Sequence, residues 1–152
     1  MVYHFKIHKE KKGFWASCIE LKGCNTQADT LDKLHKNMKE ALNLYLNEPE
    51  NSSFSFPLPH EHRPGKDIVE VPVDPKIAFA LKMKLLRREK GLSQRQAANL
   101  LEMKNIYSYQ RLESTKKANP SLTTIAKIKN IFPEFNVEDI FSSEKSKRGN
   151  SR

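Results

Sequence analysis

The residues best suited to chemistry in this 152-residue sequence lie between Gly13 and Thr30. This stretch, GFWASCIELKGCNTQADT, contains both cysteines, Cys18 and Cys24, and the only tryptophan, Trp15. Two such thiols can hold a metal ion, form a disulfide, act as a nucleophile or pack in a core. These four roles make different demands on the rest of the sequence.

A zinc site needs four ligands, and these usually include two cysteines spaced as CxxC. Here only His60 and His62, in a proline-rich segment, could join the two cysteines. A nucleophilic thiol needs a histidine and an orienting group beside it, and no such arrangement is apparent. We therefore expect no metal, no cofactor and no catalytic residue, and we interpret Cys18 and Cys24 as reduced packing residues.

Carboxylates could also do chemistry, because a two-metal nuclease needs several of them converging from strands and a helix. The first half of the chain offers Glu10, Glu20, Asp29 and Asp32. We expect Glu10 in a turn and Asp29 as a helix cap, and nothing pairs with Glu20 at a ligand-like spacing. The sequence therefore predicts a protein that is not an enzyme.

Charge divides the chain into two unlike halves. Residues 1–74 carry ten Lys/Arg and eleven Asp/Glu, a net charge of −1, whereas residues 75–152 carry seventeen and seven, a net charge of +10. A near-neutral half suits contacts with protein, and a basic half suits nucleic acid. The alternative for the basic half is a lysine-rich solubilising surface. The absence of an export signal or a long apolar run favours a cytoplasmic location.

Alternating polar and apolar residues predict strands in the first half. The segment VYHFKIH places Tyr3, Phe5 and Ile7 on one face and His4 on the other. The segment FWASCIEL is expected to be the partner strand of a hairpin, and a short third strand is expected around Asn25–Gln27.

A helix is predicted next, capped by Asp29 and ending near Asn47, because apolar residues recur in steps of three and four. Residues 48–66 contain four prolines and are expected to be irregular. The segment DIVEVPV returns as a strand, with Pro72 indicating a sheet edge. The first 74 residues are thus predicted to form a βββα-β domain of α+β class.

Helical signals dominate from Asp74 onward. The first helix is expected to begin at Asp74-Pro75 and to bury a stripe of Ile77, Leu81 and Leu85. Four more helices are expected, in the segments SQRQAANLLEM, NIYSYQRLES, NPSLTTIAKIKNIF and NVEDIF. The basic tail, residues 142–152, is expected to be disordered. Residues 75–141 are therefore predicted to be an all-α domain of five helices.

This second half resembles the phage-repressor type of helix-turn-helix. The shared motifs are Leu92-Ser93-Gln94, Ala98, Leu112-Glu113 and Asn119-Pro120-Ser121-Leu122, while Glu102 stands where that family usually has glycine in the turn. The resemblance implies binding to double-stranded DNA through a recognition helix. Tyr109 and Leu112 are expected to face the core. The residues expected to contact DNA are Gln94, Lys104, Tyr107, Ser108, Gln110, Arg111 and Lys116, although packing is an alternative role for Tyr107.

The first half resembles the HicB antitoxin family. The shared motifs, in order, are Gly13-Phe14, Ala16, Leu21-Lys22-Gly23-Cys24, Thr26-Gln27-Ala28-Asp29-Thr30 and Leu44-Tyr45-Leu46. Lys22 and Ala28 replace a usual proline and a usual glycine at turn positions. The resemblance covers residues 1 to about 141 and implies a partial ribonuclease-H-like fold without the catalytic acids.

The resemblance further implies an antitoxin that occludes a HicA-like mRNA-cleaving toxin and binds its own operator DNA as a homodimer or higher homo-oligomer. Trp15 and Ile19, on the strand face opposite Phe14, are the candidates for toxin binding, and a second buried face is an equally good explanation for them. The alternative function is a stand-alone helix-turn-helix repressor whose first domain senses a ligand or only dimerises.

Overall fold

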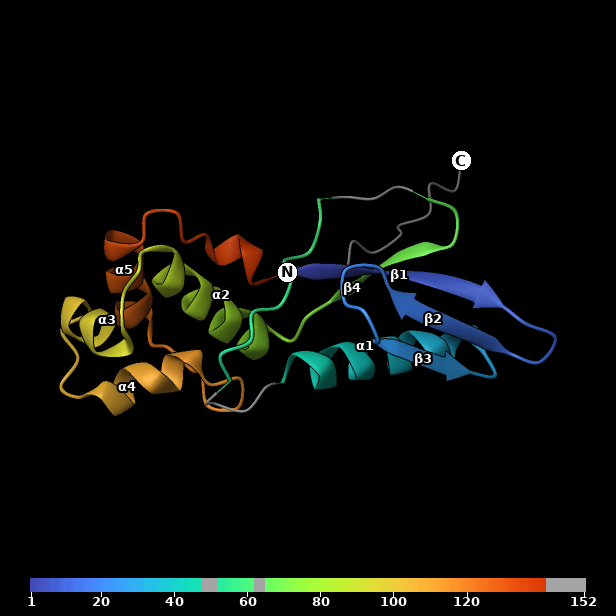
Figure 1. Ribbon diagram of the computed structural model, residues 1–152, viewed down its shortest axis with the longest axis horizontal. Coiled ribbons are helices and arrows are strands. Elements are labelled where there is room, and N and C mark those ends of the chain that lie inside the picture. Colours follow the sequence, from blue (N-terminus) through green and yellow to red (C-terminus); the bar gives the residue numbers. More distant parts are fainter. Residues whose placement is uncertain (48–51, 62–64, 142–152) are drawn as a thin grey trace.

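The alternating residues at the start of the chain form three antiparallel strands, which are β1 (Val2–Lys9), β2 (Phe14–Cys18) and β3 (Asn25–Ala28). The strand β4 (Ile68–Pro72) pairs antiparallel with the other side of β1 and gives the order β3-β2-β1-β4. Pro72 lies in this edge strand, as predicted. The computed structural model describes residues 1–47, 52–61 and 65–141, in which the sheet and five α-helices form an α+β fold (Figure 1).

The turn between β1 and β2 depends on Gly13. The backbone of Gly13 has φ +92°, in the left-handed region that favours glycine, and the amide of Glu10 donates to its carbonyl over 3.0 Å. A Cβ atom at Gly13 would lie 2.6 Å from the carbonyl oxygen of Ala28. This close approach fixes the hairpin turn against the end of β3, and it explains a glycine before Phe14.

The helix α1 (Leu31–Leu46) covers one face of the sheet with Leu34, Met38, Leu42 and Leu46, which are fully buried. The predicted cap was wrong by one residue. The side chain of Thr30, not Asp29, accepts the hydrogen bond from the amide of Lys33.

The Asp29 carboxylate instead forms an ion pair with the ammonium group of Lys33, at a distance of 3.0 Å. Because β3 remains extended through Ala28, the chain turns into the helix only at Thr30, and this places the cap one residue later than the prediction.

The helix α2 (Pro75–Glu89) begins as predicted, with the Asp74 side chain accepting from the amide of Lys76. The predicted stripe was only partly right, because Ile77 is buried whereas Leu81 and Leu85 are half-buried. The residues that fill the core are Ala78, Phe79, Ala80, Met83 and Leu86. The helix buries a wider face than one stripe because other segments pack around it, as when Phe79 meets the ring of Phe135 edge-on at 6.0 Å.

The remaining helices are α3 (Gln94–Leu100), α4 (Ile106–Gln110) and α5 (Leu122–Ile131). The short 3-10 helix η1 (Arg111–Glu113) continues directly from α4. The fifth helix predicted for the second half is only a 3-10 turn, η2 (Val137–Asp139). Figure 1 shows α2 to α5 gathered at one end of the molecule and the sheet with α1 at the other.

Polar contacts join the two ends. The Asn43 side chain accepts from the amide of Asp74 over 2.9 Å, and the Thr115 hydroxyl donates to the Asn47 side chain over 2.6 Å. The guanidinium of Arg88 donates to the Ser55 hydroxyl in the segment that follows α1. A single cluster of buried apolar residues runs through both ends, so the sequence boundary near residue 74 is not a gap in the core.

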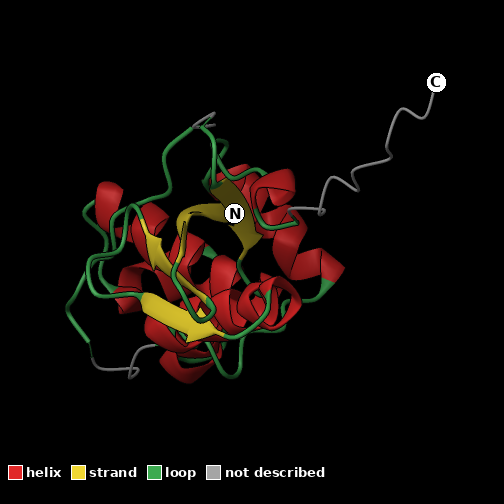
Figure 2. Cartoon of the chain, turned by 90° about the vertical axis from the view of Figure 1, so that its right-hand side faces the viewer, coloured by secondary structure: helices red, strands yellow, loops and turns green. Residues whose placement is uncertain are grey.

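The described part of the proline-rich connection, 52–61 and 65–66, contains no helix or strand, as predicted. The rest of that connection and the basic tail 142–152 lie outside the described residues. Within the described part of the chain, no helix has both the length and the apolar character that a membrane span needs. Figure 2 turns the sheet end toward the viewer and shows the helices behind the strands.

Candidate functional site

The first candidate surface is formed by α3 and α4. At the start of α3, the Ser93 hydroxyl accepts from the amide of Gln96, and the Gln96 side chain accepts from the amide of Ser93, which is the predicted capping box. At the start of α4, the Asn105 side chain accepts from the amide of Ser108 over 2.9 Å. These caps set the orientation of two short helices around the connecting residues 101–105.

The two faces of α4 and η1 are arranged as the sequence predicts. Tyr109 and Leu112 are buried in the core. Tyr107 is 73% exposed, and Ser108 and Arg111 are exposed beside it. The other residues predicted to contact DNA at exposed positions are Lys104, Gln110 and Lys116.

An open hollow of about 430 Å³ lies at this exposed face, lined by Tyr107, Gln110, Arg111 and Lys117. Its walls therefore carry two cationic side chains, an amide and a phenol. Groups of these kinds hydrogen-bond to phosphate oxygens and to base edges. The contact with DNA itself stays a prediction.

The sequence did not reveal the role of Glu113, whose side chain is 5% exposed and accepts from three residues. The guanidinium of Arg87 donates to both of its oxygens, over 2.5 and 3.1 Å. The Tyr109 hydroxyl donates over 2.7 Å, and the Gln94 amide donates over 3.1 Å. The Gln110 amide in turn donates to the Gln94 side chain over 3.1 Å. Glu113 thus ties α2, α3 and α4 together beneath the exposed face.

The electrostatics of this cluster keep Glu113 ionised. Burial opposes the charge on Glu113, but the hydrogen bonds from Arg87, Tyr109 and Gln94 outweigh burial and hold its pKa below the usual glutamate value. Gln94 was predicted to bind a phosphate. In the structure its side chain is already hydrogen-bonded to the side chains of Glu113 and Gln110. Any contact it makes with DNA is therefore made from a fixed position.

The two cysteines of the first half lie in the core, as predicted. Cys18 and Cys24 are buried and unbridged. Burial raises the pKa of the Cys18 thiol to about 12 and that of Cys24 to about 11, so both are protonated at neutral pH. Among the residues that the structure describes, no three His, Cys, Asp or Glu side chains are placed to hold a metal ion.

The surroundings of His4 and Glu20 were not predicted. His4 lies on the strand face opposite Phe5, yet it is 1% exposed, and the Glu20 carboxylate, for which the sequence offered no ligand-like partner, lies 2.6 Å from His4 Nδ1. Glu20 also accepts from the backbone amides of His4 and His60. The segment that reaches His60 covers this end of the sheet and converts two outer positions into a buried pair. No periodicity in the strand sequence could indicate that cover.

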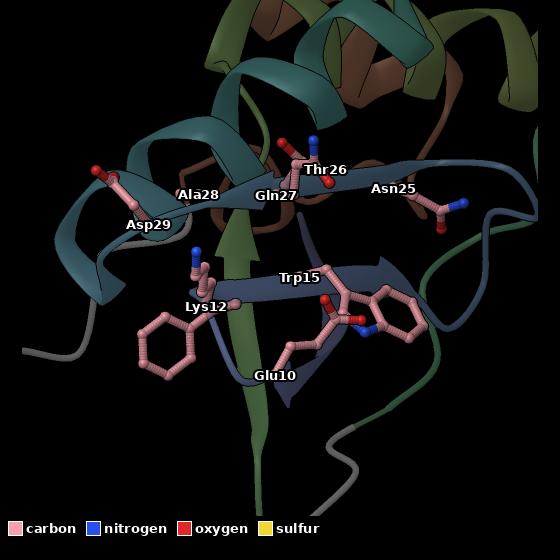
Figure 3. A pocket seen from close by; sticks show the side chains of 9 residues that line it. Glu10, Lys12, Trp15, Asn25, Thr26, Gln27, Ala28 and Asp29 are labelled. Carbon is pink, nitrogen blue, oxygen red and sulfur yellow. The ribbon is translucent and has the colours of Figure 1, made fainter.

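The second candidate surface is the sheet face opposite α1. Trp15 stacks on the ring of His8 across β1 and β2, with ring centroids 3.9 Å apart. Ile19 follows the end of β2, and its amide donates to the carbonyl of His4. The two predicted toxin-binding residues therefore lie near opposite ends of β2, and both are half-buried. Figure 3 shows Trp15 beside β3 at an open hollow.

Comparison with known proteins relates part of this chain to three curated proteins. A UPF0150 protein of Synechocystis is 31% identical over 75 residues, which is 47% of this chain and 86% of that protein. A UPF0150 protein of Helicobacter pylori is 34% identical over 56 residues, covering 37% of this chain and 78% of the relative. A UPF0150 protein of Archaeoglobus fulgidus is 38% identical over 52 residues, covering 34% and 75%.

No protein-family model matches the chain. The alignments leave at least half of this chain without a counterpart in these relatives. They nevertheless span most of each relative, at identities above 30%, and on this ground the chain belongs to the UPF0150 family.

Proposed function

We propose that this protein is an antitoxin of the HicB kind, which neutralises a small HicA-like ribonuclease and represses its own operon. The relationship to UPF0150 proteins, which are HicB-like, supports the antitoxin assignment. The ordered HicB motifs of the first half also support it. The division into a toxin-binding part, residues 1–74, and a DNA-binding part, residues 75–141, is part of the proposal.

The observation that carries the DNA-binding assignment is the exposed row on α4 and η1. Tyr107, Ser108 and Arg111 face solvent while Tyr109 and Leu112 anchor the same segment in the core. We assign α3 and α4 as a helix-turn-helix whose second helix enters the major groove. Arg111 is assigned to a guanine, which a guanidinium can bind through two parallel hydrogen bonds.

The remaining predicted residues have supporting roles. Lys104 and Lys116 are exposed near the ends of the α4–η1 segment and are assigned to phosphates. Gln94 and Gln110, which are hydrogen-bonded to each other, are assigned to the margin of the interface. The net charge of +10 over residues 75–152 supplies the long-range attraction to DNA.

Toxin neutralisation is assigned to the sheet half, by occlusion rather than by chemistry. A near-neutral domain can cover a nuclease with apolar and aromatic contacts and a few carboxylates. Ile19 and Trp15 are the proposed contacts because they are large, partly accessible side chains outside the α1 side of the sheet. The proposed homodimer lets two DNA-binding parts read a palindromic operator.

The test pairs a growth assay with a DNA-binding assay. The full chain is co-expressed with the product of the small reading frame beside its gene, and growth rescue is scored together with a pull-down. Purified protein is then titrated with the upstream DNA at increasing salt, where affinity should fall steeply at a log-log slope of about −0.9 per neutralised phosphate. Rescue without specific DNA binding would remove the repressor role, and specific binding without rescue would favour a stand-alone repressor.

A further inference from the structure

The free face of the sheet displays a set of side chains that the proposed function leaves mostly unused. The register pairs His8 with Trp15, and Trp15 with Gln27, across three neighbouring strands. It likewise pairs Lys6 with Ser17, and Ser17 with Asn25. Directly opposed residues in antiparallel strands share a face. On β1, β2 and β3 this face carries Lys6, His8, Trp15, Ser17, Asn25 and Gln27, none of them a carboxylate. The same face continues over β4, where Glu70 lies opposite His4 with 3.9 Å between the carboxylate and the imidazole.

The aromatic pair gives this face a rigid stacking surface. The rings of His8 and Trp15 are 13° from parallel with centroids 3.9 Å apart, so each ring supports the other. Trp15 also lines an open hollow of about 810 Å³, together with Lys12, Asn25 and Gln27. Figure 3 shows these residues around the strands β2 and β3. An indole held beside such a hollow can stack on a planar group that enters it.

The charges around the hollow favour an anionic ligand. Lys6 is exposed on the face itself, and Lys9, Lys11 and Lys12 are exposed on or beside the β1–β2 turn. Two carboxylates line the hollow against them, those of Glu10 and Asp29. The Asp29 carboxylate is already neutralised by Lys33 over 3.0 Å. Glu10 is then the remaining carboxylate of the lining, which also contains Lys12. With the exposed Lys6, Lys9 and Lys11 nearby in β1 and its turn, this end of the face is net basic.

The face therefore suits a ligand that combines a planar group with negative charge. A nucleotide with an unpaired base is such a ligand, because it carries a planar base beside phosphates. Double-stranded nucleic acid is a poorer fit, because stacking on an indole requires a base that has left its helix. The amides of Asn25 and Gln27 and the hydroxyl of Ser17 can both donate and accept hydrogen bonds. Such groups suit the 2′-hydroxyl, which distinguishes RNA from DNA.

We propose that the free face of the sheet binds single-stranded RNA, with one base stacked on Trp15 and the neighbouring phosphates held by Lys6 and Lys12. This site is separate from the DNA-binding surface on α4, and it does not depend on toxin neutralisation. Where a toxin also contacts Trp15, RNA and toxin compete for the same ring. Gly13 supports the site by holding the lysine-bearing turn against the end of β3.

The test uses the full chain, in which Trp15 is the only tryptophan, so that its fluorescence reports on this face alone. Decauridylate RNA should quench the emission of Trp15 in a saturable manner at low salt. The paired variant Lys6→Gln/Lys12→Gln should weaken this binding by at least about fivefold, because two phosphate contacts are lost. The matched control Lys36→Gln/Lys39→Gln removes the same charge from exposed positions on α1 and should leave the affinity unchanged.

Two further arms separate this face from the basic half of the chain. A short DNA duplex in excess should occupy the helical end without changing Trp15 emission, and RNA should still quench it. Decathymidylate DNA should bind more weakly than the RNA. The proposal is overturned if RNA bound by anisotropy leaves Trp15 unquenched, if no RNA binds, if the duplex abolishes the quenching, or if the two lysine pairs behave alike. Equal binding of the two single strands would overturn the assignment to RNA.

Discussion

The guanidinium of Arg87 on α2 donates to both carboxylate oxygens of Glu113 on η1, with Nε 2.5 Å from Oε1 and Nη2 3.1 Å from Oε2. The two side chains are 12% and 5% exposed, so the pair is shielded from water. It fixes the end of the segment that carries Tyr107 and Arg111 to the helix that runs through the core. The exposed face of α4 is thus held by a buried charge pair that lies directly beneath it.

We predict that Glu113→Ala lowers the free energy of unfolding by about 3 kcal/mol, because it leaves the Arg87 charge buried without its partner. The measurement is urea denaturation followed by far-ultraviolet circular dichroism. Glu89→Ala removes an exposed carboxylate from the end of α2 and should change stability by no more than about 0.5 kcal/mol. Equal effects of the two substitutions would show that the Arg87–Glu113 pair does not stabilise the fold.

Stability should also fall in acid. Burial opposes the charge on Glu113 and on Glu20, yet hydrogen bonds to each carboxylate hold both pKa values below the ordinary glutamate value of 4.5. A carboxyl group whose pKa is lower in the folded state contributes stability above pH 4.5 and loses that contribution as the pH falls through its folded pKa. The urea midpoint should therefore drop below pH 4.5.

The variant Glu113→Gln tests the source of this acid sensitivity. Its stability at neutral pH should be lower than that of the unaltered protein, and its further loss as the pH falls below 4.5 should be smaller. An unchanged pH dependence would assign the acid sensitivity to other carboxylates.

The elements of this fold were predictable where a local signal decided them. The capping box of Ser93 and Gln96 and the start of α2 at Asp74 each depend on residues within three positions of one another. The inward direction of Tyr109 and Leu112 followed from helical spacing once the resemblance to phage repressors had aligned the segment on Leu112-Glu113. In each case the physical cause lies within one turn of the chain.

Contacts between distant segments were not predicted. His4 became an inner residue because Glu20 and the segment at His60 close over it, and these lie 16 and 56 positions away along the chain. The partners of Glu113 come from α2, α3 and α4, so its role depends on tertiary packing that no periodic pattern encodes. The exposed residues of the α4 face were thus predicted from the sequence. The buried residue that supports this face, Glu113, was not.

Glu102 offers a stabilising substitution. It lies between α3 and α4 with φ +54°, a conformation that costs a residue with a Cβ atom roughly 1–2 kcal/mol. We predict that Glu102→Gly raises the free energy of unfolding by about 0.5–1 kcal/mol, after the greater chain entropy of glycine is allowed for. Its carboxylate is 80% exposed beside Lys127, so losing that contact should matter little. Glu102→Ala keeps the strain and should bring no gain in the same thermal or urea measurement.

The cysteines should tolerate replacement by serine without loss of activity. We expect Cys18→Ser and Cys24→Ser each to destabilise the fold by about 0.5–3 kcal/mol, because each puts a hydroxyl into a buried position. Growth rescue should persist in the double variant if it remains folded by circular dichroism. Loss of rescue in a folded double variant would mean that the thiols have a chemical role and would contradict their assignment as packing residues.

The sharpest test of the α4 face compares two cationic side chains. Arg111 is exposed next to Tyr107 and Ser108 and is assigned to a base, whereas Lys116 lies just beyond η1 and is assigned to a phosphate. We predict that Arg111→Ala weakens binding to the operator by about 1–3 kcal/mol and leaves unrelated DNA nearly unaffected, because only a base contact distinguishes sequences. Lys116→Ala should weaken binding to both DNAs alike and reduce the slope of log affinity against log salt by about one unit.

Both affinities are measured by fluorescence anisotropy over a range of salt concentrations. An equal loss on both DNAs for Arg111→Ala would place the base-reading residues on α4 rather than on η1, and Tyr107 and Ser108 would be the next positions to test.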